Sequence, residues 1–142
     1  MQMSGRVSSG LGRAHVFMAQ THYQTQFKNL LGSTVWPGTL NVQVEGSSLD
    51  EYRRLRVSSG LEEGEKSELE SHRVKGFESD GVSFGGATAF LAKISTENNE
   101  FDCAILIPDL TRHQDVVEVI ADKFLRESMT LLDGDEVHLH PR

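Results

Sequence analysis

Cysteine is nearly absent from this chain: one residue of 142, Cys103, carries a thiol. It stands in the apolar stretch 101–107, which predicts a buried strand, so we expect a structural thiol rather than a nucleophile. A single cysteine gives no sign of an oxidising compartment. At this length the chain is expected to form one domain, residues 1–142, whose core needs neither disulfides nor metals.

Long hydrophobic runs are also missing. No stretch of the chain approaches the roughly 20 apolar residues of a membrane-spanning helix. The N-terminal residues Met1-Gln2-Met3-Ser4-Gly5 lack the basic and apolar regions of a signal peptide. We therefore expect a cytoplasmic protein with no membrane partner.

Positive charge is scarce. Fourteen lysines and arginines stand against 21 aspartates and glutamates, for a formal net charge of −7. This balance opposes the sequence-independent attraction on which nucleic-acid binding relies, so we expect no nucleic-acid partner. Much of the excess lies in residues 61–70, which have few large apolar side chains and predict a solvated loop without a functional role.

The P-loop, with its Gly-Lys-Ser/Thr ending, is absent, but another glycine loop is present in Gly10-Leu11-Gly12-Arg13-Ala14-His15. We expect it between a first strand at 5–9 and a return strand at 16–18. Such a loop can bring backbone N–H groups close to an anion, and glycine pairs equally make ordinary hairpins.

The central motif is a turn that runs into an alternating strand, residues 36–44. Thr39 and Asn41 lie on the polar face of this strand, about 6 to 7 Å apart along it. Their side-chain oxygens can converge on one small ligand or hydrated cation. The alternative is a solvent-facing polar edge, which is common after a Pro-Gly turn.

Helical spacing of apolar residues predicts a helix over 21–31, with Gly32 as its C-cap. A second helix is predicted from Thr111, because Thr111 and Gln114 have the spacing of a capping box, and residues 116–121 supply an apolar stripe. Residues 52–57 predict an edge strand whose arginines are solvated.

Turn signals divide the rest of the chain into short strands. Asp80-Gly81 predicts a hairpin between strand-like stretches at 72–77 and 82–94, and Gly85-Gly86 marks a bend. Asp133-Gly134 marks a turn before a last strand. Six or more strands, two short helices and no strand-helix-strand alternation predict a mainly β fold, a small six-stranded barrel that is mostly antiparallel.

Two polar groups near the C-terminus allow two interpretations each. Lys123 and Arg126 bring two cations close together, which suits phosphate binding and equally suits a surface salt-bridge cluster. His138 and His140 share one face of the last strand, where they are either solvated or metal ligands.

Seven blocks of the sequence together carry a resemblance to a known family: Gly5-Arg6-Val7-Ser8-Ser9-Gly10-Leu11-Gly12, Pro37-Gly38-Thr39-Leu40-Asn41-Val42, Val74-Lys75-Gly76-Phe77, Phe84-Gly85-Gly86, Val116-Val117-Glu118-Val119-Ile120-Ala121, Leu125-Arg126-Glu127 and Asp133-Gly134-Asp135-Glu136-Val137. In this order the blocks resemble the archaeal CTP-dependent riboflavin kinases, cradle-loop barrels that phosphorylate riboflavin to FMN. The resemblance covers nearly the whole chain, and its Gly-Thr-Leu-Asn and Leu-Arg-Glu blocks are the most specific.

The resemblance implies transfer of phosphate from CTP to the ribityl 5′-hydroxyl of riboflavin, giving FMN and CDP, with Mg²⁺. It implies that Thr39 and Asn41 bind the magnesium ion and that Thr111 and Glu118 contact the flavin. The implied nucleotide site consists of Leu11, Gly12, Arg13, Ala14, His15, Val16, Lys123, Phe124, Leu125 and Arg126. Ala14 replaces a glycine that is usual in the family.

The sequence leaves several choices open. The general base can be Glu118, Asp115 or Glu127, and Asp115 also competes with Glu118 for the flavin contact, because the chain is one residue shorter than the family between Thr111 and Glu118. The rival function is a non-catalytic barrel that senses a flavin or nucleotide, or binds DNA as a transcription factor. The sequence does not decide the oligomeric state.

Overall fold

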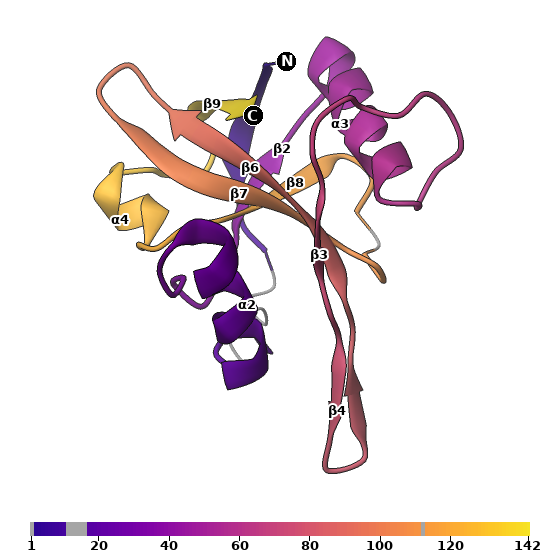
Figure 1. Cartoon of the computed structure of the whole chain (residues 1–142). Helices are drawn as coiled ribbons and strands as arrows, with labels where there is room; N and C mark the ends of the chain where they lie inside the picture. Colours follow the sequence, from indigo (N-terminus) through magenta and orange to yellow (C-terminus); the bar gives the residue numbers. More distant parts are fainter. Residues whose placement is uncertain (1, 11–16, 112) are drawn as a thin grey trace.

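A six-stranded antiparallel barrel forms the centre of the computed structural model, which describes residues 2–10, 17–111 and 113–142 (Figure 1). Around the barrel the strands follow the order β6, β7, β8, β2, β1 and β9, and β9 pairs back onto β6 to close the ring. The mainly β, antiparallel prediction is thus confirmed. The strands span β1 (Met3–Ser8), β2 (Leu40–Gln43), β6 (Ala87–Ser95), β7 (Glu100–Pro108), β8 (Val116–Ile120) and β9 (Glu136–Pro141).

Alternate residues of these strands fill the barrel. On β2, for example, Leu40 and Val42 are buried in the interior, as the period-2 pattern predicts. Cys103 on β7 is also fully buried there as a free thiol, in agreement with its predicted structural role, and burial raises its pKa to about 12. The barrel interior therefore depends on a side-chain pattern that is readable from the sequence.

Helix α2 (Thr21–Leu31) covers part of the outer surface of the barrel and confirms the predicted helix at its predicted bounds. Tyr23 and Phe27 pack with Ala104, Leu106 and other outward residues of β6, β7 and β8 in a second apolar cluster. The predicted C-cap is also confirmed. Gly32 has a left-handed backbone (φ 83°), and its N–H donates to the Lys28 carbonyl at 2.8 Å.

Three short strands form an arm that projects from the barrel (Figure 1). β3 (His72–Val74) pairs with the first half of β6, on the edge that β9 uses further along. β4 (Phe77–Ser79) and β5 (Val82–Phe84) then form the predicted hairpin. Its turn residues Asp80 and Gly81 both have positive φ, as a two-residue turn of this type requires.

The predicted second helix is wrong: residues 116–120 form strand β8. Val117 and Val119 face the barrel interior, while Ile120 packs under α2, so apolar residues stand on both faces and the strand alternation is hidden. The capping box does not form either. Instead, the Thr111 hydroxyl accepts a hydrogen bond from the His113 N–H at 3.3 Å.

The predicted edge strand at 52–57 is also wrong, because these residues belong to helix α3 (Gly46–Ser58). Tyr52 and Leu55 pack into the barrel core, and Arg56 is only 6% exposed. Far from being solvated, Arg56 donates to Glu62 at 3.0 Å and to the His113 carbonyl at 2.7 Å. This helix thereby ties the loop before β8 to one end of the barrel.

The prediction for the glycine loop and its return strand can be compared with the structure only in part. Phe17 and Met18 are helical, so the predicted return strand is wrong for these two residues. Leu11, Gly12, Arg13, Ala14, His15 and Val16, the predicted nucleotide loop, lie outside the described residues. A short helix α4 (Leu125–Ser128) follows β8. In the part of the chain that the structure describes, no helix has the length and apolar character to cross a membrane.

Candidate active site

Three strands place Ser8, Asn41 and Glu118 side by side on the outer surface of the barrel. In the antiparallel register Ser8 of β1 stands opposite Asn41 of β2, and Asn41 stands opposite Glu118 of β8. Directly opposed residues project their side chains to the same face, with Cβ atoms about 5 Å apart. We call these three residues the outer rung. It lies where β1 ends and the glycine loop begins.

Thr39 and Asn41 contact each other as their spacing predicts. The Thr39 hydroxyl donates to Asn41 Oδ1 at 3.0 Å, and both side chains are partly exposed. On the other side of the amide, a Cβ added to Gly10 would lie 2.4 Å from Asn41 Nδ2. A side chain at position 10 would therefore displace Asn41, so the first glycine of the loop has a packing role.

The donor set of Thr39 and Asn41 fits a magnesium ion. Both residues offer neutral, hard oxygen atoms, which suit an ion that keeps several waters and takes its negative ligands from phosphates. Within residues 2–10, 17–111 and 113–142, no group of three or more histidine, cysteine, aspartate and glutamate side chains forms a metal site. The described chain thus offers this site a small neutral ligand set rather than a carboxylate cage.

Among the three carboxylates proposed as a base, Glu118 has the most unusual surroundings. It is half-buried, and this burial raises its pKa, an effect that the charge of His113 partly opposes. Asp115 is exposed and accepts a hydrogen bond from Gln43 at 2.5 Å. Glu127 lies exposed on α4. Glu118 thus combines a raised pKa with a place beside Asn41.

A pocket joins the Thr39 turn to the segment 123–126. Thr39 and Gly38 line it from one side and Lys123 and Arg126 from the other, although these residues are more than 80 positions apart in the sequence. The Lys123 ammonium lies 3.2 Å from Asp122 and 4.7 Å from the centre of the Phe101 ring. The structure therefore brings the two predicted halves of this site together.

Arg126 holds the base of the glycine loop. Its guanidinium donates to Asp133 at 2.6 Å and to the Ser8 carbonyl at 3.2 Å, while the Ser9 hydroxyl donates to the same aspartate at 2.5 Å. The hydrogen bond from Ser9, followed by that from Arg126, lowers the pKa of Asp133. Arg126 thus connects the end of β1 to the turn before β9. Leu125, also predicted in the nucleotide site, is buried in the barrel core.

Trp36 is a residue of this pocket that the sequence reasoning missed. Its ring stacks on Phe124, with centroids 5.1 Å apart and planes inclined by 20°, and both rings are well exposed at 47% and 39%. The available signal was a tryptophan directly before the Pro-Gly turn. The backbone N–H of Trp36 donates to the Ala121 carbonyl at 2.8 Å, which fixes this turn beside the end of β8.

The two predicted flavin contacts lie on consecutive segments of the chain, a turn and the strand that follows it. Thr111, half-buried, stands on the turn after β7, where its N–H donates to the Pro108 carbonyl at 3.1 Å, and Glu118 lies in the following strand. The two C-terminal histidines are separate from this region. His138 contacts the Ser4 hydroxyl at 2.7 Å and His140 that of Ser95 at 3.4 Å, so each has its own serine partner.

Known proteins resemble this chain over nearly its whole length. The sequence model of a family described as a domain of unknown function, DUF120, and named CTP-dep_RFKase, matches residues 7–140. Relatives named riboflavin kinase include those of Thermoplasma acidophilum, 36% identical over 135 residues and 95% of this chain, and Methanospirillum hungatei, 35% identical over 139 residues and 96% of this chain. The riboflavin kinase of Pyrobaculum islandicum is 34% identical over 140 residues and 98% of this chain.

The matched regions cover 54%, 56% and 59% of these three relatives, so this chain spans little more than half of their length. Within the chain, however, the family match is nearly complete, from the end of β1 to β9. The chain therefore belongs to the CTP-dependent riboflavin kinase family.

Proposed function

We propose that this protein phosphorylates riboflavin to FMN, with CTP as the phosphate donor and Mg²⁺ as the metal ion. The observation that carries the proposal is the outer rung with Thr39 beside it. There the start of a glycine loop, a neutral oxygen pair and a half-buried carboxylate meet at one place on the barrel. Membership of the family supports the choice of substrates.

Phosphoryl transfer requires mainly positioning and neutralisation of charge. When bound, Mg²⁺ would neutralise charge on the terminal phosphates of the nucleotide. Thr39 and Asn41 would hold it through their side-chain oxygens. Lys123, across the pocket from Thr39, supplies a positive charge for the phosphates. Arg126 lines the same pocket, and its guanidinium holds Ser8 at the start of the loop.

Glu118 is the base that we assign to the acceptor. In the proposed reaction the ribityl 5′-oxygen forms a bond to the γ-phosphorus of CTP, the bond from that phosphorus to the CDP oxygen breaks, and the hydroxyl proton passes to Glu118. A carboxylate whose pKa is raised by burial is a stronger base at neutral pH than an exposed one. Thr111 would bind the flavin from the neighbouring turn.

A direct assay tests the proposal. The purified chain is incubated with riboflavin, Mg²⁺ and either CTP or ATP, and FMN is quantified by chromatography, with EDTA as the metal control. We expect FMN with CTP, much less with ATP and none with EDTA. No FMN with either nucleotide would overturn the kinase assignment. FMN with ATP alone would overturn the donor assignment.

The same preparation separates the kinase from a sensor. A non-catalytic barrel would quench riboflavin or FMN fluorescence on binding without converting one into the other. A DNA-binding module would change neither signal, and the net charge of −7 already opposes this function. Binding and conversion together are the result that the kinase requires.

A further inference from the structure

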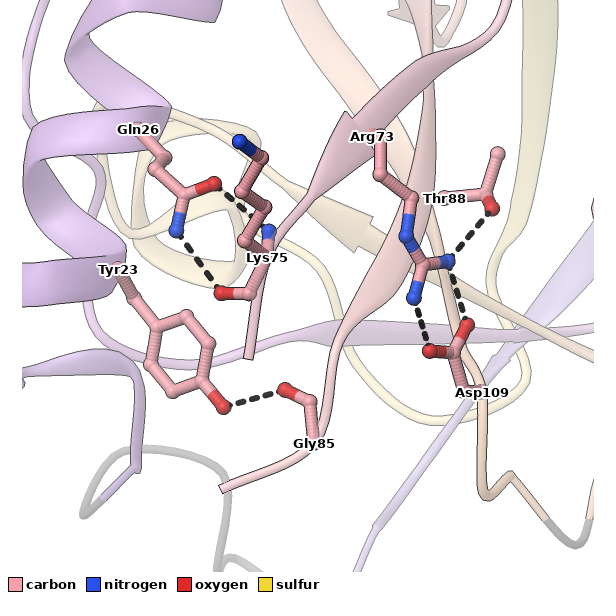
Figure 2. A network of polar contacts seen from close by, with 7 residues as sticks. All are labelled: Tyr23, Gln26, Arg73, Lys75, Gly85, Thr88 and Asp109. Atoms are coloured by element: carbon pink, nitrogen blue, oxygen red, sulfur yellow. Dashed lines mark hydrogen bonds and ion pairs between the residues drawn. The ribbon is translucent and has the colours of Figure 1, made fainter. Parts of the chain in front are cut away.

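The turn that carries Thr111 is attached to the base of the arm by an ion pair. Arg73 of β3 contacts Asp109, the first residue after β7, through both terminal nitrogens of its guanidinium (Figure 2). Nη1 donates to Oδ1 at 2.7 Å, and Nη2 donates to Oδ2. The Asp109 N–H also donates to the Gly86 carbonyl at 3.0 Å. Both the side chain and the backbone of Asp109 are therefore bonded to the arm.

Gly86 leaves room for this ion pair because it has no side chain. A Cβ added to it would lie 2.6 Å from Arg73 Nη2 and 3.0 Å from Asp109 Oδ2, and 2.8 Å from the Val74 carbonyl oxygen. The guanidinium and the carboxylate thus occupy space that any side chain at position 86 would take. The bidentate contact therefore depends on a glycine at the junction between β3, β6 and the turn.

The arm itself is held from the opposite side by α2. The Tyr23 hydroxyl donates to the Gly85 carbonyl at 2.5 Å, and the Gln26 side chain pairs with both backbone groups of Lys75, at 2.9 and 2.7 Å (Figure 2). These contacts fix the arm independently of Arg73. Arg73 therefore projects from a segment whose position is already fixed. Its ion pair with Asp109 then fixes the position of the turn 109–111.

The exposure of this ion pair argues that it contributes position more than stability. The Arg73 side chain is 52% exposed and that of Asp109 is 32% exposed, and ion pairs in water contribute little to folding. The next residue, Leu110, is 83% exposed, so the turn has little apolar packing to fix it. A two-point charged contact on the preceding residue compensates for this lack of packing.

We infer that Arg73 and Asp109 are positioning residues for the flavin substrate: their ion pair sets the place of the turn 109–111 and hence of Thr111. This inference rests on the proposed function, which assigns Thr111 to riboflavin. Among the residues that the structure describes, neither Arg73 nor Asp109 lines the pocket between Thr39 and Lys123. The ion pair should therefore affect the affinity for riboflavin and leave that for CTP unchanged.

The experiment compares Asp109→Asn and Arg73→Gln with Arg142→Gln. The control breaks a similarly exposed Arg–Asp pair, Arg142 with Asp102 at 2.8 Å, near the opposite end of β7. Riboflavin affinity is measured by quenching of flavin fluorescence, CTP affinity by calorimetry and Tm by thermal denaturation. We expect the riboflavin Kd to rise about tenfold in either test variant, because a small displacement of a binding group is costly. The double variant that combines Arg73→Gln with Asp109→Asn should have a riboflavin Kd no higher than that of the more affected single variant.

Three results with the variants would overturn the inference. The first is a riboflavin Kd in the test variants that matches the control. The second is a parallel loss of riboflavin affinity, CTP affinity and Tm, which would indicate a structural role alone. The third is a double variant whose loss is the sum of the single losses. The proposed function fails separately, if the wild-type chain binds riboflavin without forming FMN. A wild-type chain that does not bind riboflavin would overturn both.

Discussion

Two adjacent rungs of the same three strands differ completely in character. Val7, Val42 and Val117 stand opposite one another on β1, β2 and β8, and none is more than 2% exposed. One residue along each strand in the pairing register, the outer rung of Ser8, Asn41 and Glu118 is polar and partly exposed. The inner rung belongs to the barrel core. The outer one belongs to the candidate site.

The difference teaches that fold and chemistry are carried by alternate residues, so each can be changed with limited effect on the other. Burial of a valine contributes about 1.5 kcal/mol or more to folding. Burial of the Glu118 carboxylate acts in the opposite direction, since desolvation disfavours its charged form. The barrel therefore supports a site whose parts do not all favour folding.

The largest effect is expected on the outer rung, from Asn41→Ala. This change removes the amide oxygen that accepts from Thr39 and would bind Mg²⁺. FMN formation should fall by about a hundredfold or more, because the loss of a metal ligand costs several kcal/mol of transition-state stabilisation. Tm should stay close to that of the wild-type chain, since the side chain is partly exposed. Initial rates across a Mg²⁺ titration check the first expectation and thermal denaturation the second.

Normal turnover by a folded Asn41→Ala protein would remove the metal assignment and leave the outer rung as a polar strand edge. Thr39→Val is the companion variant. It removes the hydroxyl but keeps the branched shape, and it should raise the Mg²⁺ concentration needed for half-maximal activity. A fall in Tm for Asn41→Ala as large as that for Val42→Ala would erase the distinction between the two rungs.

An intermediate effect is expected on the inner rung, from Val42→Ala. Val42 is fully buried between Val7 and Val117, so the shorter side chain leaves a cavity in the barrel. The free energy of unfolding should fall by about 2 kcal/mol. Denaturant unfolding measures this change, and FMN formation below the transition should remain near the wild-type rate. A large loss of activity without a loss of stability would show that the inner rung also tunes the site.

The barrel was predictable where one face of a strand is buried and the other is wet. Residues 40–43 alternate cleanly and form β2, and the periodic stretch 21–31 forms α2. β8 was not predictable in this way, because Val117 and Val119 point inward while Ile120 is covered by α2. With both faces buried, length and periodicity no longer distinguish a strand from a helix.

A repeated hexapeptide shows the limit of local pattern most directly. The sequence Arg-Val-Ser-Ser-Gly-Leu begins at Arg6 and again at Arg56. In the first copy Arg6, Val7 and Ser8 end strand β1, while in the second Arg56, Val57 and Ser58 end helix α3. Arg6 is exposed, and Arg56 is buried against Glu62. Identical residues adopt different structures here because tertiary contacts outweigh intrinsic propensity.

The candidate site was predictable only in its local part. The contact of Thr39 with Asn41 follows from their spacing on a strand. The approach of Gly10 to Asn41, the place of Glu118 opposite Asn41 and the bonds of Arg126 depend on strand register between distant segments. Register is set by the closure of the whole barrel, which local sequence windows do not contain.

The smallest effect on stability, of opposite sign to that of Val42→Ala, is expected from Glu118→Gln. The charged form of Glu118 is disfavoured in the folded state, because burial raises its pKa above the ordinary value. Well below the unfolded-state pKa of about 4.3, the carboxyl is neutral in both states and its burial has no electrostatic cost. As pH rises towards the folded-state pKa, the unfolded chain ionises first, and folding loses stability. Glutamine has no charge to desolvate, so Glu118→Gln should raise Tm at pH 7.5 and raise it much less at pH 4. Thermal denaturation at both pH values measures the difference. An unchanged or lowered Tm at pH 7.5 would mean that other interactions of the carboxylate offset the cost of its burial, and the outer rung would then lose its contrast with the inner one.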